Sequence, residues 1–294
     1  MKPNRFTYHR PTSLGDAITA LAGLPNAKVL AGGQSLMPML NLRIADPGHL
    51  IDLGGIDGLA YIRAEGQEVR IGALTTQRTI EFSEIVRERL PLIAQAILEL
   101  GHRQTRNRGT IGGSLCHLDP SAELPLMASV FGATIVVAGP AGLREIPVAE
   151  FTEDMLTPAI DADEIVTEIR FLPWPDGHGW GFAEYARRKG DFAIVSAAAM
   201  LLLDGQGRIA RSALALGGVA SVPFRVESAE AELIGELPSE ELFGRVAEVC
   251  AEVDPLDDPF VPGWYRQKLS VTYARRVLNE AWARCENAKG PRHV

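Results

Sequence analysis

The sequence predicts an α+β protein of two domains, and three observations lead to this prediction. Short strand-like segments and helical stripes follow one another up to residue 172. A proline- and glycine-rich stretch from Pro173 to Gly179 is typical of a domain boundary. Beyond it, two strands precede a set of helices, an order that favours the α+β class. We therefore expect one domain at residues 1–173 and a smaller one at residues 177–285.

The N-terminal part predicts one helix followed by short strands. A stripe of apolar residues from Leu14 to Leu21 predicts the helix, with Ser13 as its N-cap and Asp16 in the capping-box position. The strands are expected at Ala27–Leu30, at His49–Leu53, and on both sides of a turn at Gly66-Gln67 within residues 61–72.

The rest of the chain predicts a mixture of helices and strands. In the first domain, helices are expected at Leu90–Leu98 and Ser121–Val130, and strands at Ala133–Ala138 and Glu164–Leu172. In the second, the turn at residues 204–207 joins an antiparallel pair, Ser196–Leu203 and Ser212–Val219. Further helices are expected at Ala229–Ile234, at Glu240–Cys250 and along a final stripe from Ala274 to Cys285.

The composition excludes several classes of function. The 294 residues carry a net charge of −8, which offers no basic surface for nucleic acid. Cys116, Cys250 and Cys285 are too few and too far apart to hold an iron–sulfur cluster. The N-terminus lacks a signal-peptide core, and the longest apolar run, Val195 to Leu203, is too short to span a bilayer. We therefore expect a soluble, cytoplasmic chain that has no transmembrane segment and binds no nucleic acid.

Two short glycine loops are the main functional signal. One is Ala31-Gly32-Gly33-Gln34-Ser35, and the other is Thr110-Ile111-Gly112-Gly113-Ser114. Consecutive main-chain N–H groups in such turns can form a nest for phosphate oxygens, and two nests would suit a long diphosphate ligand. Each loop could equally be an ordinary tight turn. Neither fits the G-x-G-x-x-G fingerprint or the P-loop, so a different cofactor cradle is required.

Three ordered motifs resemble those of a known family. They are Ala31-Gly32-Gly33-Gln34-Ser35-Leu36 with Arg43 and Ile51-Asp52-Leu53, Arg106 to Ser114 with His117 to Pro125, and Arg188-Lys189-Gly190-Asp191-Phe192-Ala193. Together they resemble the FAD-carrying medium subunit of molybdenum hydroxylases, such as carbon monoxide and xanthine dehydrogenases. The resemblance implies a two-lobed FAD-binding domain of the vanillyl-alcohol-oxidase type, divided near residue 54. It also implies that the smaller C-terminal α+β domain is of the CO-dehydrogenase flavoprotein type.

The resemblance also implies which residues contact FAD. Residues 31–35 would hold the diphosphate through main-chain N–H groups, and residues 110–114 would meet its other side and the ribityl chain. The implied contacts are Ala31, Gly32, Gly33, Gln34, Ser35, Leu36, Thr110, Ile111, Gly112, Gly113, Ser114, Asp119, Glu123, Ile165, Arg188, Lys189 and Phe192.

Several of these residues have an alternative structural role. Asp119 and Glu123 could accept hydrogen bonds from flavin hydroxyls or could cap a helix. Arg188 or Lys189 could lie near the flavin pyrimidine or in a solvated turn. Phe192 could cover the flavin or pack in a core.

Four further residues leave similar alternatives. Ile165 could contact the adenine or be an ordinary core residue. Arg103, Arg106 and Arg108, which precede the second loop, could neutralise phosphate, meet an acidic partner or be solvated. The residues around His102 and His117 lack metal-ligand spacing, so no metal site is expected.

The resemblance implies electron transfer within a larger complex. The expected partners are a molybdopterin-binding large subunit and a small subunit with [2Fe–2S] clusters, and by analogy the complex is expected to be a dimer of heterotrimers. This chain would take electrons from the clusters and pass them to an external acceptor, with no catalytic residue of its own. The alternative is a stand-alone flavin-dependent reductase or oxidase with its own small-molecule substrate.

Overall fold

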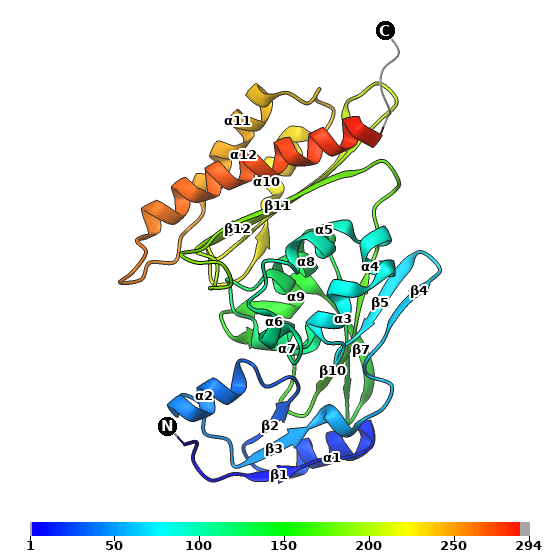
Figure 1. Ribbon diagram of the computed structural model, residues 1–294, viewed down its shortest axis with the longest axis vertical. Coiled ribbons are helices and arrows are strands. Elements are labelled where there is room, and N and C mark those ends of the chain that lie inside the picture. The colour runs from blue at the N-terminus through cyan, green and yellow to red at the C-terminus, as the bar shows by residue number, and fades with distance from the viewer. Residues whose placement is uncertain (1, 289–294) are drawn as a thin grey trace.

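The computed structural model describes residues 2–288. They form three parts stacked along the long axis of the molecule, in the order of the sequence (Figure 1). The N-terminal part is a parallel sheet of order β1-β3-β2, made of Thr7–His9, His49–Asp52 and Ala27–Leu30. Helix α1 (Leu14–Gly23) packs on it, and the Ser13 hydroxyl accepts a hydrogen bond from the Asp16 main-chain N–H at 3.1 Å. A glycine loop connects β2 to α2 (Leu36–Leu42), and the 3₁₀ helix η1 (Leu53–Gly55) follows β3.

The middle part is built on an antiparallel sheet of order β4-β5-β10-β6-β7. Its strands are Ile62–Glu65, Glu68–Gly72, Ile165–Phe171, Thr134–Gly139 and Gly142–Pro147. Short helices lie on one face of this sheet (Figure 1), and most of them supply apolar side chains to the core there. They are α3 (Gln77–Phe82), α4 (Glu84–Arg89), α5 (Pro91–Ala96), α6 (Arg103–Arg106), α7 (Ile111–His117), α8 (Glu123–Phe131) and α9 (Val148–Phe151), and a small pair, β8 (Thr152–Asp154) and β9 (Thr157–Pro158), follows them.

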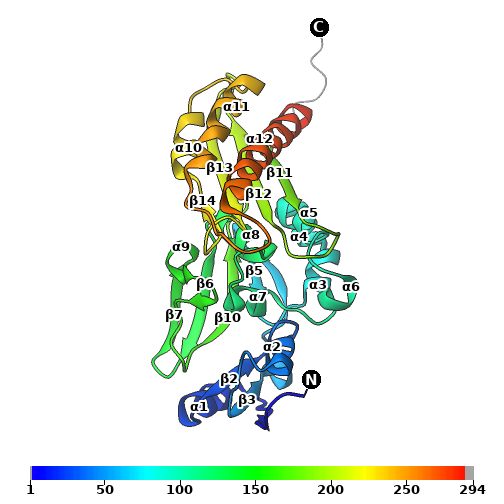
Figure 2. The same cartoon turned by 90° about the vertical axis from the view of Figure 1, so that its left-hand side faces the viewer.

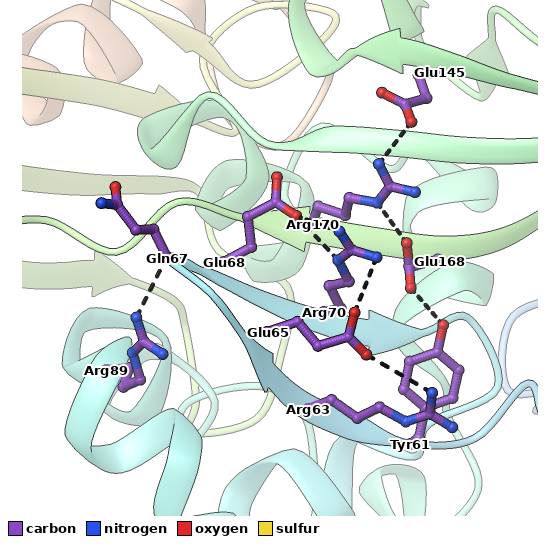
Figure 3. Close-up of polar contacts among 10 residues, drawn as sticks. All are labelled: Tyr61, Arg63, Glu65, Gln67, Glu68, Arg70, Arg89, Glu145, Glu168 and Arg170. Atoms are coloured by element: carbon purple, nitrogen blue, oxygen red, sulfur yellow. Dashed lines mark hydrogen bonds and ion pairs between the residues drawn. The ribbon is translucent and has the colours of Figure 1, made fainter.

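The other face of the five-stranded sheet carries a ladder of charged side chains (Figure 3). Arg170 joins Glu168 on its own strand to Glu145 on β7, at 2.5 and 2.6 Å. The Tyr61 hydroxyl donates to Glu168, and this contact together with burial raises the pKa of Tyr61 to about 12. Because residues on alternate positions point to opposite faces of a strand, these charged side chains point away from the apolar core of the middle part.

The C-terminal part is an antiparallel sheet of order β11-β12-β13-β14 with helices on one face (Figure 2). The strands are Gly179–Tyr185, Val195–Leu203, Ile209–Gly217 and Phe224–Arg225, and the helices are α10 (Glu227–Leu233), α11 (Glu240–Glu248), η2 (Val249–Glu252) and α12 (Gly263–Ala288). Helix α12 lies directly against β11, since a Cβ atom on Gly181 would overlap the Val277 carbonyl oxygen and lie 3.0 Å from its carbonyl carbon.

The C-terminal sheet is buried on both faces, and this places the second domain against the first. Ala198 and Met200 on β12 belong to the core of the middle part, which includes α5 and α8. Their neighbours Ala197 and Ala199 point the other way, into a core formed with α11 and α12. The two domains therefore share one apolar core on one side of this sheet.

Most predicted elements are present, with two informative differences. The helix predicted at Leu90–Leu98 is shorter, because α4 ends at Arg89 and Pro91 begins a separate helix, α5. Strand β11 was not predicted, because Gly179 and Gly181 interrupt its apolar pattern. Among residues 2–288, no helix is long and apolar enough to cross a membrane.

Candidate cofactor site

A cavity of about 710 Å³ opens where the three parts of the chain meet. Fourteen of the seventeen residues expected to contact FAD line it: Ala31, Gly32, Gly33, Gln34, Ser35, Leu36, Thr110, Gly112, Gly113, Ser114, Asp119, Glu123, Ile165 and Phe192. Ile111, Arg188 and Lys189 do not. The fold therefore brings both glycine loops and the third motif to one cavity.

The first glycine loop offers unused hydrogen-bond donors to this cavity. Within the described chain, the main-chain N–H groups of Gly32, Gly33, Gln34 and Ser35 donate no hydrogen bond. Gly33 has a φ of +71°, a left-handed conformation that favours glycine. Four neighbouring N–H groups without internal partners are suited to bind the oxygens of an anionic group such as a diphosphate.

The second glycine loop is different, because residues 111–114 form the first turn of α7 with Thr110 as its N-cap, and the expectation of a second nest is wrong. The N–H groups of these four residues already donate within the chain: Ile111 to the Thr75 carbonyl, Gly112 to the Ala73 carbonyl, and Gly113 and Ser114 to Thr110. Ile111 belongs to the apolar core of the middle part and does not line the cavity. This loop therefore forms part of the cavity wall and contributes side chains such as that of Ser114, but it offers few main-chain donors.

The glycines also allow the two loops to approach each other closely. A Cβ atom on Gly32 would overlap the Arg108 carbonyl oxygen and lie 2.8 Å from the Cα atom of Gly109. On the opposite side, a Cβ atom on Gly112 would lie 2.6 Å from the Cβ atom of Ala73. The absence of a side chain at Gly32 and Gly112 thus allows neighbouring segments of the chain to pack closely at the cavity wall.

The two predicted acids occupy different environments. Asp119 accepts a hydrogen bond from the Ser121 N–H at 2.8 Å, so it stabilises the turn before α8 while also lining the cavity. Glu123 is only 6% exposed. Burial, with a smaller contribution from the nearby charges of Glu184, Asp119 and Glu99, raises the pKa of Glu123 to about 8. The Glu123 carboxyl group is therefore easier to protonate near neutral pH than an ordinary glutamate, and its contact with flavin hydroxyls stays a prediction.

The raised pKa of Glu123 makes the stability of the FAD-free chain depend on pH. Between its ordinary value of 4.5 and about 8, the folded chain keeps a proton that the unfolded chain loses. The free energy of unfolding is therefore expected to fall as pH rises through this window. Denaturant titrations at several pH values check this, and Glu123→Gln is expected to show a shallower fall.

The exposed residue Glu241 on α11 provides the control for this measurement. Glu241→Gln is expected to retain the full pH dependence. Identical pH profiles for Glu123→Gln and the wild type would contradict the burial of a protonated Glu123.

The third motif reaches the cavity through its second half. Gly190, Asp191 and Phe192 line the wall, and the Phe192 side chain is 65% exposed, which excludes ordinary core packing for it. Arg188 instead pairs with Asp191 at 3.1 Å, and Lys189 pairs with Glu99 at 3.7 Å. Arg188 and Lys189 thus lie in a solvated turn, which is one of the two positions considered for them.

The basic residues before the second loop have separate roles. Arg106 pairs with Glu81 at 2.9 Å and donates to the carbonyls of Leu100 and Gly101, so it anchors α6. Arg108 is exposed and lines a second cavity of about 620 Å³ on the outer side of the first loop. Among the three arginines, Arg108 is thus the one whose side chain remains beside the loop that offers free N–H groups.

The structure adds residues that sequence reasoning missed. Lys28 on β2 is the only lysine or arginine among the described residues that line the main cavity. Gln77 on α3 also lines it, and its Oε1 atom is buried without a partner in the described chain. A cation, an unsatisfied acceptor and four free N–H groups fit a long, polar, anionic ligand such as FAD. One feature of the sequence could have identified Lys28: it lies just before Val29 and Leu30, which lead into the first glycine loop.

Comparison with known proteins identifies the family of the chain. The model of the FAD binding domain in molybdopterin dehydrogenase matches residues 4–175, and that of the CO dehydrogenase flavoprotein C-terminal domain matches residues 180–281. The chain is 36% identical over 287 residues to the carbon monoxide dehydrogenase medium chain of Hydrogenophaga pseudoflava, covering 97% of this chain and 100% of that protein.

Solved structures give the same result. A structure of carbon monoxide dehydrogenase from Hydrogenophaga pseudoflava superposes with a TM-score of 0.94 at 38% identity, covering 97% of this chain and 100% of that one. Quinoline 2-oxidoreductase from Pseudomonas putida 86 superposes with a TM-score of 0.92 at 34% identity, covering 98% and 99% of the two chains. The predicted α+β fold and the predicted FAD cofactor are confirmed by these matches. The chain is an oxidoreductase subunit and belongs to the family of FAD-binding medium subunits of molybdenum hydroxylases.

Proposed function

We propose that this chain is the electron-transfer subunit of a molybdenum hydroxylase complex. It takes electrons from [2Fe–2S] clusters in a small partner subunit and passes them to an external acceptor, while a molybdopterin-binding large subunit oxidises the substrate. The observation that carries this proposal is the cavity in which free N–H groups of residues 32–35 meet Lys28, in a chain that aligns over its full length with a medium chain.

The residues of this chain supply binding and electrostatics, and bound FAD supplies the redox chemistry. The N–H groups of residues 32–35 would donate to the diphosphate, and Lys28 would offset part of its charge. Glu123 would donate a hydrogen bond as a neutral acid. A raised pKa also means that burying Glu123 beside an anionic cofactor costs less than burying a charged carboxylate would.

We further propose a dimer of heterotrimers as the assembled complex. The name "medium chain" of the relative implies larger and smaller partner chains in that protein. The three widely spaced cysteines favour a reducing compartment, so we place the complex in the cytoplasm.

This function predicts two results for the purified chain. After reconstitution, the chain is expected to bind one FAD, measured by the flavin absorption bands that remain after gel filtration. Expressed with its neighbouring reading frames, it is expected to co-purify with chains that contain iron–sulfur clusters and molybdopterin, measured by metal analysis.

Two outcomes would contradict the proposal. A chain without flavin bands after reconstitution would not be a flavoprotein subunit. A chain that turns over an organic substrate by itself, without partner subunits, would instead be the stand-alone flavin-dependent reductase or oxidase.

A further inference from the structure

Two large aromatic side chains are exposed where α12 begins. Phe260 precedes the helix and is 76% exposed, and Trp264 lies in its first turn and is 59% exposed. The other three tryptophans of the chain are buried or half-buried. Aromatic side chains are enriched in protein interfaces, and exposed apolar groups that lie near one another indicate a site for another molecule. The start of α12 is therefore a candidate docking site.

The connection between β11 and β12, which carries the third motif, packs against this segment. Arg187 donates a hydrogen bond to the Phe260 carbonyl at 3.2 Å, and its guanidinium lies 5.7 Å from the centre of the Phe260 ring. The ring of Tyr185, at the end of β11, meets that of Tyr265 on α12 edge to face, with 6.3 Å between their centres. The two segments lie side by side at one end of the C-terminal sheet (Figure 1). The exposed aromatic residues and the third motif therefore share one surface.

This surface adjoins the opening of the cofactor cavity. Residues 190–192, which directly follow Lys189, line the cavity wall. Phe192 is also 65% exposed, so the cavity opens to solvent at this point. Phe260 and Trp264 do not line the cavity. A molecule bound to them would therefore lie beside the cofactor without filling the cavity that holds it.

The surface is basic although the whole chain is acidic. Residues 185–192 and 257–268 contain five arginines and lysines against three aspartates, in a chain of net charge −8. Asp191 pairs with Arg188, and Asp258 pairs with the buried Arg266. Exposed Arg187 and Lys268 form no ion pair in the part of the chain that the structure describes. Their charges therefore remain available to an acidic partner.

We propose that this surface is the docking site of the small [2Fe–2S] subunit, and that this subunit meets it with an apolar centre and acidic surroundings. The inference rests on the proposed function and adds to it the place and the chemistry of the contact. The docking surface consists of Phe260, Trp264, Arg187, Arg188, Lys189 and Lys268.

The composition and the position of the docking surface favour this subunit over a soluble electron acceptor. Permanent interfaces are more apolar than transient ones, and burial of Phe260 and Trp264 is most useful with a partner that stays bound. Surfaces of opposite charge also select one another and fix the register of a complex. The place beside the cavity opening suits a subunit that delivers electrons, because electrons cross protein only over short distances.

The first test compares side-chain exposure in the free chain and in its complex with the small subunit, obtained by expression with the neighbouring reading frame. Hydroxyl-radical footprinting read by mass spectrometry reports this exposure. Phe260 and Trp264 are expected to lose most of their reactivity in the complex. Leu143 on β7, which is 73% exposed in the middle part, is expected to keep its reactivity and serves as the control. Unchanged reactivity of Phe260 and Trp264 would overturn the proposal.

The second test measures the affinity of the purified chain for the separately purified small subunit by calorimetry. Phe260→Ser and Trp264→Ser are each expected to weaken binding by about thirtyfold or more, the size typical of truncating a central interface residue. Leu143→Ser is expected to bind as the wild type does. Because both aromatic residues are exposed and lie outside the cavity, their variants are expected to keep wild-type FAD affinity and unfolding midpoints. Wild-type subunit affinity in both variants would contradict the docking surface.

The third test addresses the charge of the partner. The affinity of the wild type for the small subunit is expected to fall as salt is added, because salt screens exposed charges. Arg187→Glu combined with Lys268→Glu is expected to weaken binding and to make its salt dependence shallower. Arg63→Glu changes a side chain that is 59% exposed on β4 and is expected to alter neither property. Salt-independent binding by the wild type would overturn the acidic partner.

The outcomes separate this inference from the proposed function. A wild-type chain that never binds an iron–sulfur subunit contradicts the proposed function and the docking surface together. Normal subunit binding in every surface variant contradicts the docking surface alone. In that case, a change in self-association of the variants in analytical ultracentrifugation would assign the surface to a second copy of this chain. Slower reduction of a soluble acceptor by the complex would assign it to that acceptor.

Discussion

Gly32→Ala is expected to reduce FAD affinity by about tenfold to a hundredfold. The new Cβ atom would overlap the Arg108 carbonyl oxygen and press on Gly109 Cα, and both belong to main chain that cannot rotate away. Relief of such overpacking costs about 1–3 kcal/mol, and about 1.4 kcal/mol corresponds to a tenfold change in affinity. The loop must move to accommodate the methyl group, which displaces the free N–H groups from the cavity wall. Fluorescence titration of the FAD-free chain measures the effect.

Gly244→Ala is the matched control. Gly244 lies inside α11, where a Cβ atom would meet nothing within 4 Å. This change is expected to stabilise the fold by about 0.5–1 kcal/mol, because alanine favours the helix, and to leave FAD affinity unaltered. Wild-type affinity in Gly32→Ala would show that the close approach of the two loops is unimportant for the cofactor.

Arg266→Met is expected to destabilise the chain by about 3–5 kcal/mol, since two buried carbonyls would each lose a charge-assisted hydrogen bond worth about 1.5–3 kcal/mol. Arg266 on α12 is only 7% exposed and donates to the carbonyls of Ile194 and Gly218, both at 2.6 Å. It also pairs with Asp258 at 2.6 Å. The Gly218 N–H in turn donates to the Pro120 carbonyl at 2.7 Å. One guanidinium thus connects the last helix to Ile194, just after the cavity-lining residue Phe192, and to Gly218, which is hydrogen-bonded to the Pro120 segment.

Chemical denaturation measures this loss of stability, and two further variants serve as comparisons. Arg266→Lys keeps the charge but lacks the planar fork, so an intermediate loss is expected. Arg275→Met changes an exposed residue on the same helix and is expected to stay within about 0.5 kcal/mol of the wild type. A loss in Arg266→Met no larger than that in Arg275→Met would mean that the two carbonyls find other donors.

Local rules predicted much of the fold. Ser13 caps α1 because its hydroxyl reaches an N–H only three residues away, and such contacts are visible in the sequence. The hairpin at Gly66-Gln67 is also set by neighbouring residues. Strand β11 escaped prediction because Gly179 and Gly181 weaken its pattern, and the reason for those glycines is the backbone of α12, about a hundred residues later.

The candidate site shows the same limit. The glycine loops were found from their composition, but their different roles depend on distant partners. The N–H groups of Ile111 and Gly112 donate hydrogen bonds to the carbonyls of residues 75 and 73, and no local pattern in the sequence predicts this pairing. Burial raises the pKa of Glu123 in the same way, because burial depends on the folded structure and not on neighbouring residues in the sequence. Lys28 was missed because a lysine on a short strand looks like any solvated cation.

The contrast between the two glycine loops bears on how the holoprotein is assembled. The second loop already uses its N–H groups in hydrogen bonds within the chain, so only the first loop keeps free donors for the cofactor. Neither the second loop nor the helix that it begins depends on the cofactor for its hydrogen bonds. A chain built in this way can fold first, persist as an empty receptor and be loaded later, which separates the supply of flavin from the synthesis of the polypeptide.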